Sequence, residues 1–542
     1  MRVLRHALGT LLLLGTAPLL GAAGTPAHGD DTRPGDRRPA ALAPYEQLLP
    51  APLSAHAAGR GYAFGPGTVI RTRPGAGAQV RQVGELLAEQ LRGPSGLPLP
   101  VVEGAGQEGI RLRIDEQAAG VGEEGYRLES GPDGVTLTAR TPAGLFHAGQ
   151  TLRQLVPAAG PGTVPGGTVT DRPRFAHRGA MLDIARHFFT VGQVKRYVDQ
   201  LVAYKVNTLH LHLTDDQGWR IAVDSWPRLA QYGGVGEVGG GPGGYWTKED
   251  YRELVAYAAE RFVEVVPEID MPGHVNAALA SYAELTCDGK APPRYTGTKV
   301  GFSSLCVGKE RTYTFIDEVL GEIARLTPGR YLHIGGDEAH ATPAADYAAF
   351  MDRAQAVVGR HGKTVVAWHQ LAAARPAKGA VLQYWGHDRT AAAEKAAVAA
   401  AAKAGHPVIL SPADRAYLDM KYDPQTKPGL SWAGYVPVQR SYAWDPGSYL
   451  DGVPESAVLG VEAALWTENV ATREDLELMA FPRVLGLAEL GWSTGPADWA
   501  AYRHRLAAQG PRLDARGIGY HRTAEVPWPQ ASPGSAPGVR VS

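Results

Sequence analysis

Eight short apolar runs, separated by segments of helix-like composition, recur along the chain from about residue 174 onward. They lie at 177–186, 208–216, 263–270, 331–338, 364–369, 380–385, 407–412 and 457–468. Strands that alternate with helices build parallel sheets, and eight such units predict a (β/α)8 TIM barrel. The expected fold class is therefore α/β, with the barrel over residues 173–522.

The predicted strands end in residues that can do chemistry. In barrels of this kind the active site lies at the C-terminal ends of the strands. The residues found at these ends are Arg186, Asp215, Asp270, Asp337 with Glu338, Trp368, Trp385 and Glu468. Seven of the eight ends therefore carry charged or aromatic side chains, and we expect these side chains to face one pocket.

The segment 43–172 has a different pattern and predicts a small α+β domain ahead of the barrel. A helix is expected over 79–91, stopped by Gly93 and Pro94. A hairpin is expected over 125–140, with its turn at 131–134. Thr141 and Pro142 have the character of an N-cap and a first helical residue.

The two ends of the chain carry further signals. Arg2 and Arg5 precede an apolar run over 7–23, followed by small and polar residues. This pattern predicts a signal peptide over 1–28, and hence a secreted, extracellular protein; an uncleaved membrane anchor is the alternative. The segment 523–542 is proline-rich and predicts a C-terminal tail without fixed structure.

Charge and cysteine content narrow the function. The formal net charge is -1 and no long basic run occurs, which argues against nucleic acid or an anionic membrane surface as the main partner. The only two cysteines, Cys287 and Cys306, fall in one predicted loop region. In an oxidising compartment they are expected to form a disulfide, with two free thiols as the alternative.

Several acids around one pocket suggest glycoside hydrolysis. That reaction commonly uses one carboxylic acid to protonate the leaving oxygen and a second carboxylate as base or nucleophile. Asp337 and Glu338 are adjacent, however, and neighbours on a regular strand point to opposite faces. Either the strand ends before them or they have separate roles. Aromatic residues that could pack on a sugar are Trp368, Trp385, Tyr417, Trp432 and Trp466.

Three longer motifs carry a family resemblance. "LHLTDDQGWR", "PEIDMPGH" and "HIGGDE" occur in this order at predicted strand ends, and they resemble glycoside hydrolase family 20, the β-N-acetylhexosaminidases. The resemblance covers nearly all of the mature chain. It implies an exo-acting enzyme that removes terminal non-reducing N-acetylglucosamine or N-acetylgalactosamine from oligosaccharides such as chitooligosaccharides and glycans.

The resemblance also implies a mechanism with retention of configuration. The carbonyl oxygen of the substrate's own 2-acetamido group acts as nucleophile and forms an oxazolinium intermediate. Glu338 is then implied to be the general acid and later the general base. Asp337 is implied to orient the acetamido N–H and stabilise the developing positive charge. Asp215 and His274 are implied to support the acid, and Tyr417 to donate to the acetamido oxygen.

Further substrate contacts follow from the same resemblance. Trp368, Trp385 and Trp466 are implied to surround the acetamido methyl group. Sugar hydroxyl groups are implied to bind Arg186, Glu468 and Asp419, and Trp432 to stack on the sugar or its neighbour. Asp270 is expected to support the site without touching substrate. No metal and no cofactor are expected.

Two alternatives compete with this interpretation. His210 and His212 have the i, i+2 spacing that places both on one strand face, as in barrel metallohydrolases. A non-catalytic sugar-binding protein could use the same aromatic residues. The Asp337–Glu338 pair argues against the second alternative, because a pure binder needs no proton donor beside the scissile bond.

Overall fold

The computed structural model describes residues 42–158, 160 and 162–530. The predicted signal peptide lies outside these residues. Within them the chain forms one compact unit, in which an α+β part precedes a closed barrel.

The α+β part is built on a seven-stranded sheet with the order β1-β9-β6-β7-β5-β3-β4. In chain order its strands are β1 (Ser54–Ala57), β3 (Ile70–Thr72), β4 (Val101–Glu103), β5 (Gly109–Ile114), β6 (Tyr126–Gly131), β7 (Gly134–Ala139) and β9 (Gly167–Asp171). A separate pair consists of β2 (Tyr62–Ala63) and β8 (Thr163–Val164). The predicted hairpin is confirmed as β6–β7, which pair antiparallel.

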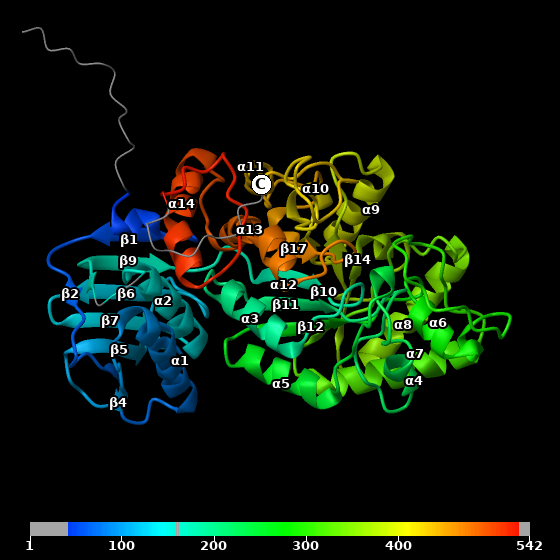
Figure 1. The fold of residues 1–542 in the computed structure, drawn as a ribbon, viewed down its shortest axis with the longest axis horizontal. Coiled ribbons are helices and arrows are strands. Elements are labelled where there is room, and N and C mark those ends of the chain that lie inside the picture. The colour runs from blue at the N-terminus through cyan, green and yellow to red at the C-terminus, as the bar shows by residue number, and fades with distance from the viewer. Residues whose placement is uncertain (1–41, 159, 161, 531–542) are drawn as a thin grey trace, which may run out of the picture. The chain divides into compact units, whose positions relative to one another are not determined.

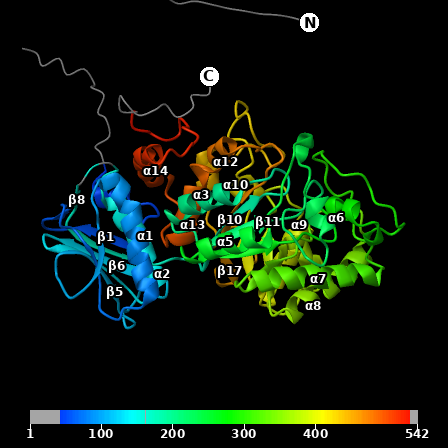
Figure 2. The same ribbon diagram turned by 60° about the horizontal axis from the view of Figure 1, so that its bottom comes forward.

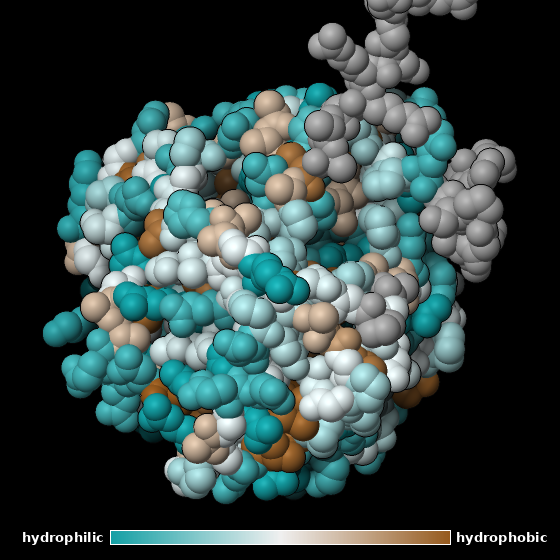
Figure 3. Space-filling view, turned by 90° about the vertical axis from the view of Figure 1, so that its left-hand side faces the viewer, coloured by the Kyte–Doolittle hydropathy of each residue, from teal (hydrophilic) through white to brown (hydrophobic). Residues whose placement is uncertain are grey.

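Two helices, α1 (Ala78–Ser95) and α2 (Pro142–Leu155), cover one face of this sheet (Figure 1). The predicted N-cap of α2 is confirmed, because the Thr141 side chain accepts a hydrogen bond from the Gly144 N–H. Figure 3 shows the surface on the left-hand side of Figure 1, where the α+β part lies. This surface is mainly polar or neutral, with small scattered hydrophobic patches.

The predicted end of α1 was wrong. The helix continues through Pro94 to Ser95, and it ends where Gly96 adopts a left-handed conformation with φ 69°. A proline in the last turn removes only one backbone hydrogen bond. The Ser95 hydroxyl adds a bond in the same turn, since it donates to the Leu91 carbonyl at 2.6 Å.

The barrel prediction is confirmed: eight parallel strands close in the order β10 to β17. They are β10 (His177–Asp183), β11 (Thr208–His212), β12 (Glu264–Glu268), β13 (Tyr331–His333), β14 (Thr364–Trp368), β15 (Val381–Tyr384), β16 (Val408–Leu410) and β17 (Val458–Leu465). Each lies within or overlaps one of the eight apolar runs.

Helices surround the barrel and connect its strands, and α7 and α8 lie side by side on its outside (Figure 2). The longer helices are α3 (Val191–Val202), α5 (Lys248–Ala259), α7 (Glu310–Leu326), α8 (Ala344–Arg360), α9 (Ala392–Lys403), α12 (Arg473–Ala480), α13 (Arg483–Trp492) and α14 (Trp499–Ala515). The short helices are α4 (Arg228–Gln231), α6 (Asn276–Ser281), α10 (Ala413–Ala416), α11 (Val438–Tyr442), and the 3-10 turns η1 (Pro44–Gln47), η2 (Val238–Gly240), η3 (Ala283–Leu285), η4 (His369–Ala373) and η5 (Glu455–Ala457).

The barrel interior is layered. An apolar layer consists of Val266, Tyr331, Val366, Val381 and Ile409. Two residues further along the same strands, and therefore on the same inward face, lie Glu268, His333, Trp368, Gln383 and Ser411. All of these are buried. The interior layer nearer the C-terminal ends of the strands is thus mostly polar. The alternate strand positions point outward and pack against the outer helices.

The α+β part contacts the barrel through α2 and through a buried ion pair. Phe146 on α2 packs against Phe262, with ring centroids 5.5 Å apart. Lys205, which follows α3, donates to Asp171 on β9 at 2.9 Å, and both side chains are 1% exposed. Tyr126 donates to the same carboxylate at 2.7 Å.

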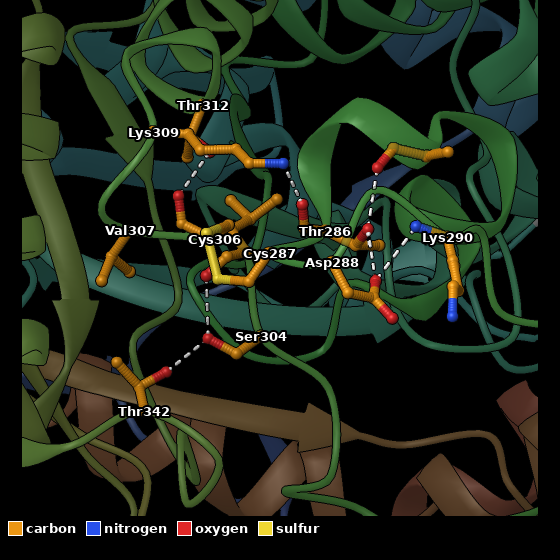
Figure 4. The surroundings of a disulfide bond; sticks show 12 residues. Thr286, Cys287, Asp288, Lys290, Ser304, Cys306, Val307, Lys309, Thr312 and Thr342 are labelled. Carbon is orange, nitrogen blue, oxygen red and sulfur yellow. Dashed lines mark hydrogen bonds between the residues drawn. A yellow bond between two sulfur atoms is a disulfide. The ribbon is translucent and has the colours of Figure 1, made fainter.

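The predicted disulfide is present. Cys287 and Cys306 are joined and close a loop between η3 and α7 (Figure 4). Neighbouring hydrogen bonds hold the loop, because Thr312 donates to the Cys306 carbonyl at 2.8 Å and Lys309 donates to the Thr286 carbonyl.

Part of the predicted C-terminal tail is packed on the protein. Val526 is 3% exposed, and the Trp528 ring lies 5.0 Å from that of Tyr520. The prediction of a tail without fixed structure from 523 was therefore wrong for 523–530, where the apolar side chains find a surface to bury against; 531–542 lie outside the described residues. Across the part of the chain that the structure describes, no helix is both long and apolar enough to cross a membrane.

Candidate active site

The backbone leaves strand geometry before the acid pair. β13 ends at His333, and Gly335 and Gly336 then have φ 62° and 96°, while Glu338 has φ 43°. A side chain at Gly335 would place its Cβ 1.7 Å from Asp270 Oδ1, so only glycine fits there. The alternation of a regular strand therefore does not apply to Asp337 and Glu338.

Both acids face His274. The His274 Nε2 atom lies 3.8 Å from Asp337 Oδ2 and 3.6 Å from Glu338 Oε2. His274 follows β12 and has a positive φ of 54°, an uncommon conformation for a residue other than glycine. Positive φ at both His274 and Glu338 stores strain at this point, a feature that concentrates at functional sites.

A third carboxylate, that of Asp215, contacts the other ring nitrogen of His274. His274 Nδ1 lies 3.1 Å from Asp215 Oδ1. Asp215 Oδ2 also lies 2.8 Å from the Arg186 guanidinium and 2.7 Å from His212 Nε2. Burial by itself would raise the pKa of Asp215, but Arg186 and His274 outweigh it and hold the pKa well below its usual range. Asp215 is therefore a buried carboxylate anion.

His274 is correspondingly a cation. Burial lowers its pKa, but the charges of Asp215, Asp337 and Asp270 oppose burial and raise the pKa well above the usual histidine value. The site therefore contains a charged imidazole between one permanent carboxylate and the acid pair.

The two acids of the pair have different surroundings. The Asp337 side chain is 10% exposed, whereas the Glu338 side chain is 30% exposed. Burial raises the pKa of Asp337 to about 6, with His274 opposing and the Glu338 charge adding to the increase. Asp270 supports this segment from below, since its Oδ1 accepts from the Gly336 N–H at 3.1 Å.

A cluster of aromatic side chains, which we call the aromatic pocket, lies beside the acids. Trp368, Tyr417 and Trp466 belong to a small buried cluster that is separate from the main core, with Trp385 packed against it. The rings of Trp368 and Trp466 are 5.8 Å apart, and those of Tyr417 and Trp466 are 6.2 Å apart. The Arg186 guanidinium lies over the Trp466 ring at 4.9 Å and so joins the charged and aromatic halves.

Trp432 forms the exposed edge of this pocket. Its ring lies 5.9 Å from Tyr417 and 6.0 Å from Trp385, yet the residue is 44% exposed. The aromatic residues beside the acids therefore combine buried rings with one solvent-exposed ring.

Several buried polar atoms here have no hydrogen-bond partner among the described residues. They are Arg186 Nε, His274 Nε2, Asp337 Oδ1, Asp419 Oδ2 and Glu468 Oε2. Burial raises the pKa of Asp419 and of Glu468, with the Glu468 charge adding to the rise at Asp419. Buried polar groups are normally paired, so this concentration indicates a site for a polar ligand.

The structure brings all of the predicted catalytic and sugar-binding residues into one connected cluster. They are Arg186, Asp215, His274, Asp337, Glu338, Trp368, Trp385, Tyr417, Asp419, Trp432, Trp466 and Glu468.

Sequence reasoning missed the buried carboxylates beneath this cluster. Glu268 Oε2 is 2.5 Å from His212 Nδ1, and Glu462 Oε1 is 2.7 Å from His210 Nδ1. The signal that could have found them is an acidic residue inside an apolar strand run, at an inward-facing position.

These contacts bear on the metallohydrolase alternative. Groups such as His210, Glu268 and His333 lie close enough together to hold a cation. However, both ring nitrogens of His210 and of His212 lie 2.5–3.0 Å from carboxylate oxygens. Nitrogens that donate to carboxylates carry protons and offer no lone pair to a metal. The two histidines act as partners of buried carboxylates.

Comparisons with known proteins agree with this geometry. The model of the glycosyl hydrolase family 20 catalytic domain matches residues 175–345 and 341–495, and that of family 20 domain 2 matches residues 45–172. A β-N-acetylhexosaminidase of Cellulomonas fimi is 44% identical over 463 residues, which cover 84% of this chain and 92% of the relative.

Solved structures are similar over almost their whole length. The family 20 β-N-acetylhexosaminidase of Streptomyces coelicolor A3(2) is 60% identical, with a TM-score of 0.87 over 90% of this chain and 99% of that chain. The Streptomyces plicatus N-acetyl-β-hexosaminidase in complex with thio-NAglucal is also 60% identical, with a TM-score of 0.88 over 91% and 99% of the two chains. The present chain therefore belongs to glycosyl hydrolase family 20 and is a glycoside hydrolase.

Proposed function

We propose that the protein is an exo-acting β-N-acetylhexosaminidase that hydrolyses terminal non-reducing N-acetylglucosamine or N-acetylgalactosamine with retention. The observation that carries this proposal is the meeting of Asp337 and Glu338 at one histidine, His274, beside the aromatic cluster of Trp368, Tyr417 and Trp466.

In the first step Glu338 donates a proton to the leaving oxygen. The acetamido carbonyl oxygen of the substrate attacks the anomeric carbon, the glycosidic bond breaks, and an oxazolinium ion forms. Glu338, now a carboxylate, takes a proton from water, which attacks the anomeric carbon and reopens the ring. The greater exposure of Glu338 suits a group that meets both the leaving group and water.

Asp337 serves the acetamido group. Its Oδ1 atom is buried and has no hydrogen-bond partner among the described residues, so it can accept the acetamido N–H. A carboxylate at this point stabilises the positive charge that spreads over the forming ring. The neighbouring acids thus contact different parts of one substrate.

The aromatic pocket holds the acetamido group in the attacking geometry. Trp368, Trp385 and Trp466 offer apolar faces to its methyl group, and the Tyr417 hydroxyl donates to its carbonyl oxygen. Fixing a nucleophile in this way is worth about 7 kcal/mol of barrier in favourable cases. The unpaired polar atoms of Arg186, Asp419 and Glu468 bind the sugar hydroxyl groups.

Two kinds of relative support the choice of substrate. A Streptomyces plicatus structure contains the product N-acetylglucosamine, and a Vibrio harveyi relative is named N,N'-diacetylchitobiase. We extend both to this chain and propose chitooligosaccharides and N-acetylhexosamine-terminated glycans as substrates. The N-terminal sequence pattern and the Cys287–Cys306 disulfide support a place of action outside the cell.

The experiment is hydrolysis of aryl 2-acetamido-2-deoxy-β-D-glucoside and its galacto counterpart, followed by product analysis on chitotetraose. The proposal expects aryl release from the gluco compound and N-acetylglucosamine as the sole early product from the oligosaccharide. E338Q is the matched control and should release almost no product. Early release of chitobiose in place of the monosaccharide would contradict exo action.

A further inference from the structure

A chain of alternating imidazoles and carboxylates continues below the active site into the barrel. His212 Nε2 lies 2.7 Å from Asp215 Oδ2, and His212 Nδ1 lies 2.5 Å from Glu268 Oε2. His210 then links Glu268, at 3.0 Å, to Glu462, at 2.7 Å. All five side chains are buried, and Asp215 is the member that reaches the active site.

His212 is doubly protonated in this arrangement. A neutral imidazole has one donor and one acceptor nitrogen, so it cannot donate to two carboxylates. The ring of His212 is 0% exposed and places one nitrogen on each of two carboxylates. Burial lowers its pKa, but Glu268 and Asp215 outweigh burial and raise the pKa well above the usual value.

Glu268 connects the same cation to the aromatic pocket. The Trp368 indole N–H donates to Glu268 Oε1 at 2.8 Å, while the other oxygen faces His212 and His210. His333 Nδ1 lies 2.9 Å from Oε1. The orientation of the pocket floor and the position of Asp215 are therefore fixed by one buried group of charges.

We infer that His212 is a positioning residue of the reaction, holding Asp215, and through it His274, in place under the acid pair. This inference rests on the proposed function for the roles of Asp337 and Glu338. His212 acts through two contacts: directly on Asp215, and through Glu268 on Trp368. It touches neither the substrate nor the proton donor.

The His212 charge acts on the titratable groups that lie around the ring. They are Asp215 and, from β12 and the loop after it, Glu268 and Asp270; His212, Asp215 and Asp270 have ligand atoms within 4.8 Å of one another. The ring of Trp466, which directly follows β17, lies 4.8 Å from the imidazole.

The His212 charge also reaches Asp337. Burial is the main cause of the raised pKa of Asp337, and His212 is one of the cations that oppose it. Burial likewise raises the pKa of Asp270, and the His212 charge opposes that rise. Removal of the His212 charge therefore makes Asp337 a weaker acid, which means that kcat/KM falls at a higher pH.

The test uses two substitutions that each keep one of the two donors. H212Q places an amide N–H near the former Nε2 and can still donate to Asp215. H212N places it near the former Nδ1 and can donate only to Glu268. Both lose the charge, so both should move the acidic limb of kcat/KM upward by about one pH unit. H212N should also lower kcat by about tenfold more than H212Q.

H177Q is the matched control. His177 is another buried barrel histidine, 5% exposed, and it pairs with Glu462 at 2.7 Å, away from Asp215. H177Q should lower thermal stability while leaving kcat and the acidic limb in place. Unchanged kcat and an unchanged limb in both His212 variants would overturn the inference, as would an equal shift in H177Q.

A second measurement does not depend on the variants folding. Neutron diffraction from crystals of the unsubstituted protein in deuterated buffer at pH 7 should show deuterium on both nitrogens of His212. A bare nitrogen facing Asp215 or Glu268 would overturn the inference. This result is independent of turnover, so it stands apart from failure of the proposed function, which would appear as absent hydrolysis by the unsubstituted enzyme.

Discussion

Asp337 and Glu338 are adjacent in the chain, and both lie within 4 Å of the same histidine nitrogen, yet the side chain of Asp337 is 10% exposed and that of Glu338 is 30% exposed. The backbone just before the buried member is held by Asp270, whose Oδ1 accepts from the Gly336 N–H at 3.1 Å. These two environments fit the two different roles that we propose for the adjacent acids.

Asp337 should set the acidic limb of the activity profile. Its pKa is raised to about 6, so the carboxylate is progressively protonated as the pH falls through 6 and can no longer accept the acetamido N–H. We expect kcat/KM for an aryl 2-acetamido glycoside to fall below about pH 6. D337N should remove this limb and lower kcat at every pH. A profile that is flat down to pH 4 would contradict this assignment.

The Tyr417 hydroxyl should contribute to kcat through the acetamido oxygen. Y417F keeps the ring in the aromatic cluster but removes the donor, so kcat should fall by about 10²-fold. Tyr422 provides the control, since it is buried and its hydroxyl lies 3.0–3.1 Å from three main-chain carbonyl oxygens, to one of which it can donate. Y422F should lower thermal stability and leave kcat within about threefold. Equal losses of kcat in both variants would argue against a specific role for Tyr417.

The buried Lys205–Asp171 pair should stabilise the junction between the α+β part and the barrel. K205M leaves the Asp171 carboxylate, 1% exposed, without its cation, which should cost about 3–5 kcal/mol of unfolding free energy. Lys195 and Glu253 form a surface pair whose side chains are 22% and 62% exposed. K195M should therefore cost less than about 1 kcal/mol. Denaturant unfolding of both variants measures the contrast, and similar losses would refute it.

The disulfide should stabilise the fold through its loop. Cys287 and Cys306 are separated by 19 positions, and closing a loop of this size is worth about 3 kcal/mol in the chain-entropy model. C287S/C306S should melt at a lower temperature than the unsubstituted protein. Reductant should lower the melting temperature of the latter toward that of the variant and leave the variant unchanged. A reductant effect on the variant would point to another cause.

The strand pattern was predictable because each barrel strand is an apolar run, and seven of the eight runs carry a charged or aromatic residue at or near their C-terminal end. Trp385 follows β15 directly, while Asp215 and Asp337 come three and four residues after β11 and β13. Their convergence also followed, because parallel strands in a barrel bring their C-terminal ends to one face.

The polar interior was not predictable in the same way. Glu268 and Glu462 lie inside apolar runs, and their partners His212 and His210 are 56 and 252 positions away along the chain. The sequence showed the two histidines on one strand face, which is equally compatible with a metal site. Only the three-dimensional pairing shows that carboxylates occupy both nitrogens of each ring.

The most direct test of the mechanism compares two aryl β-glycosides on the purified enzyme: a 2-acetamido-2-deoxy glucoside and the matching glucoside with a 2-hydroxyl group. Attack by the acetamido oxygen predicts rapid aryl release from the first and almost none from the second. Comparable release from both would contradict substrate-assisted catalysis. A protein carboxylate would then have to act as the nucleophile, a role that the proposed mechanism gives to no residue.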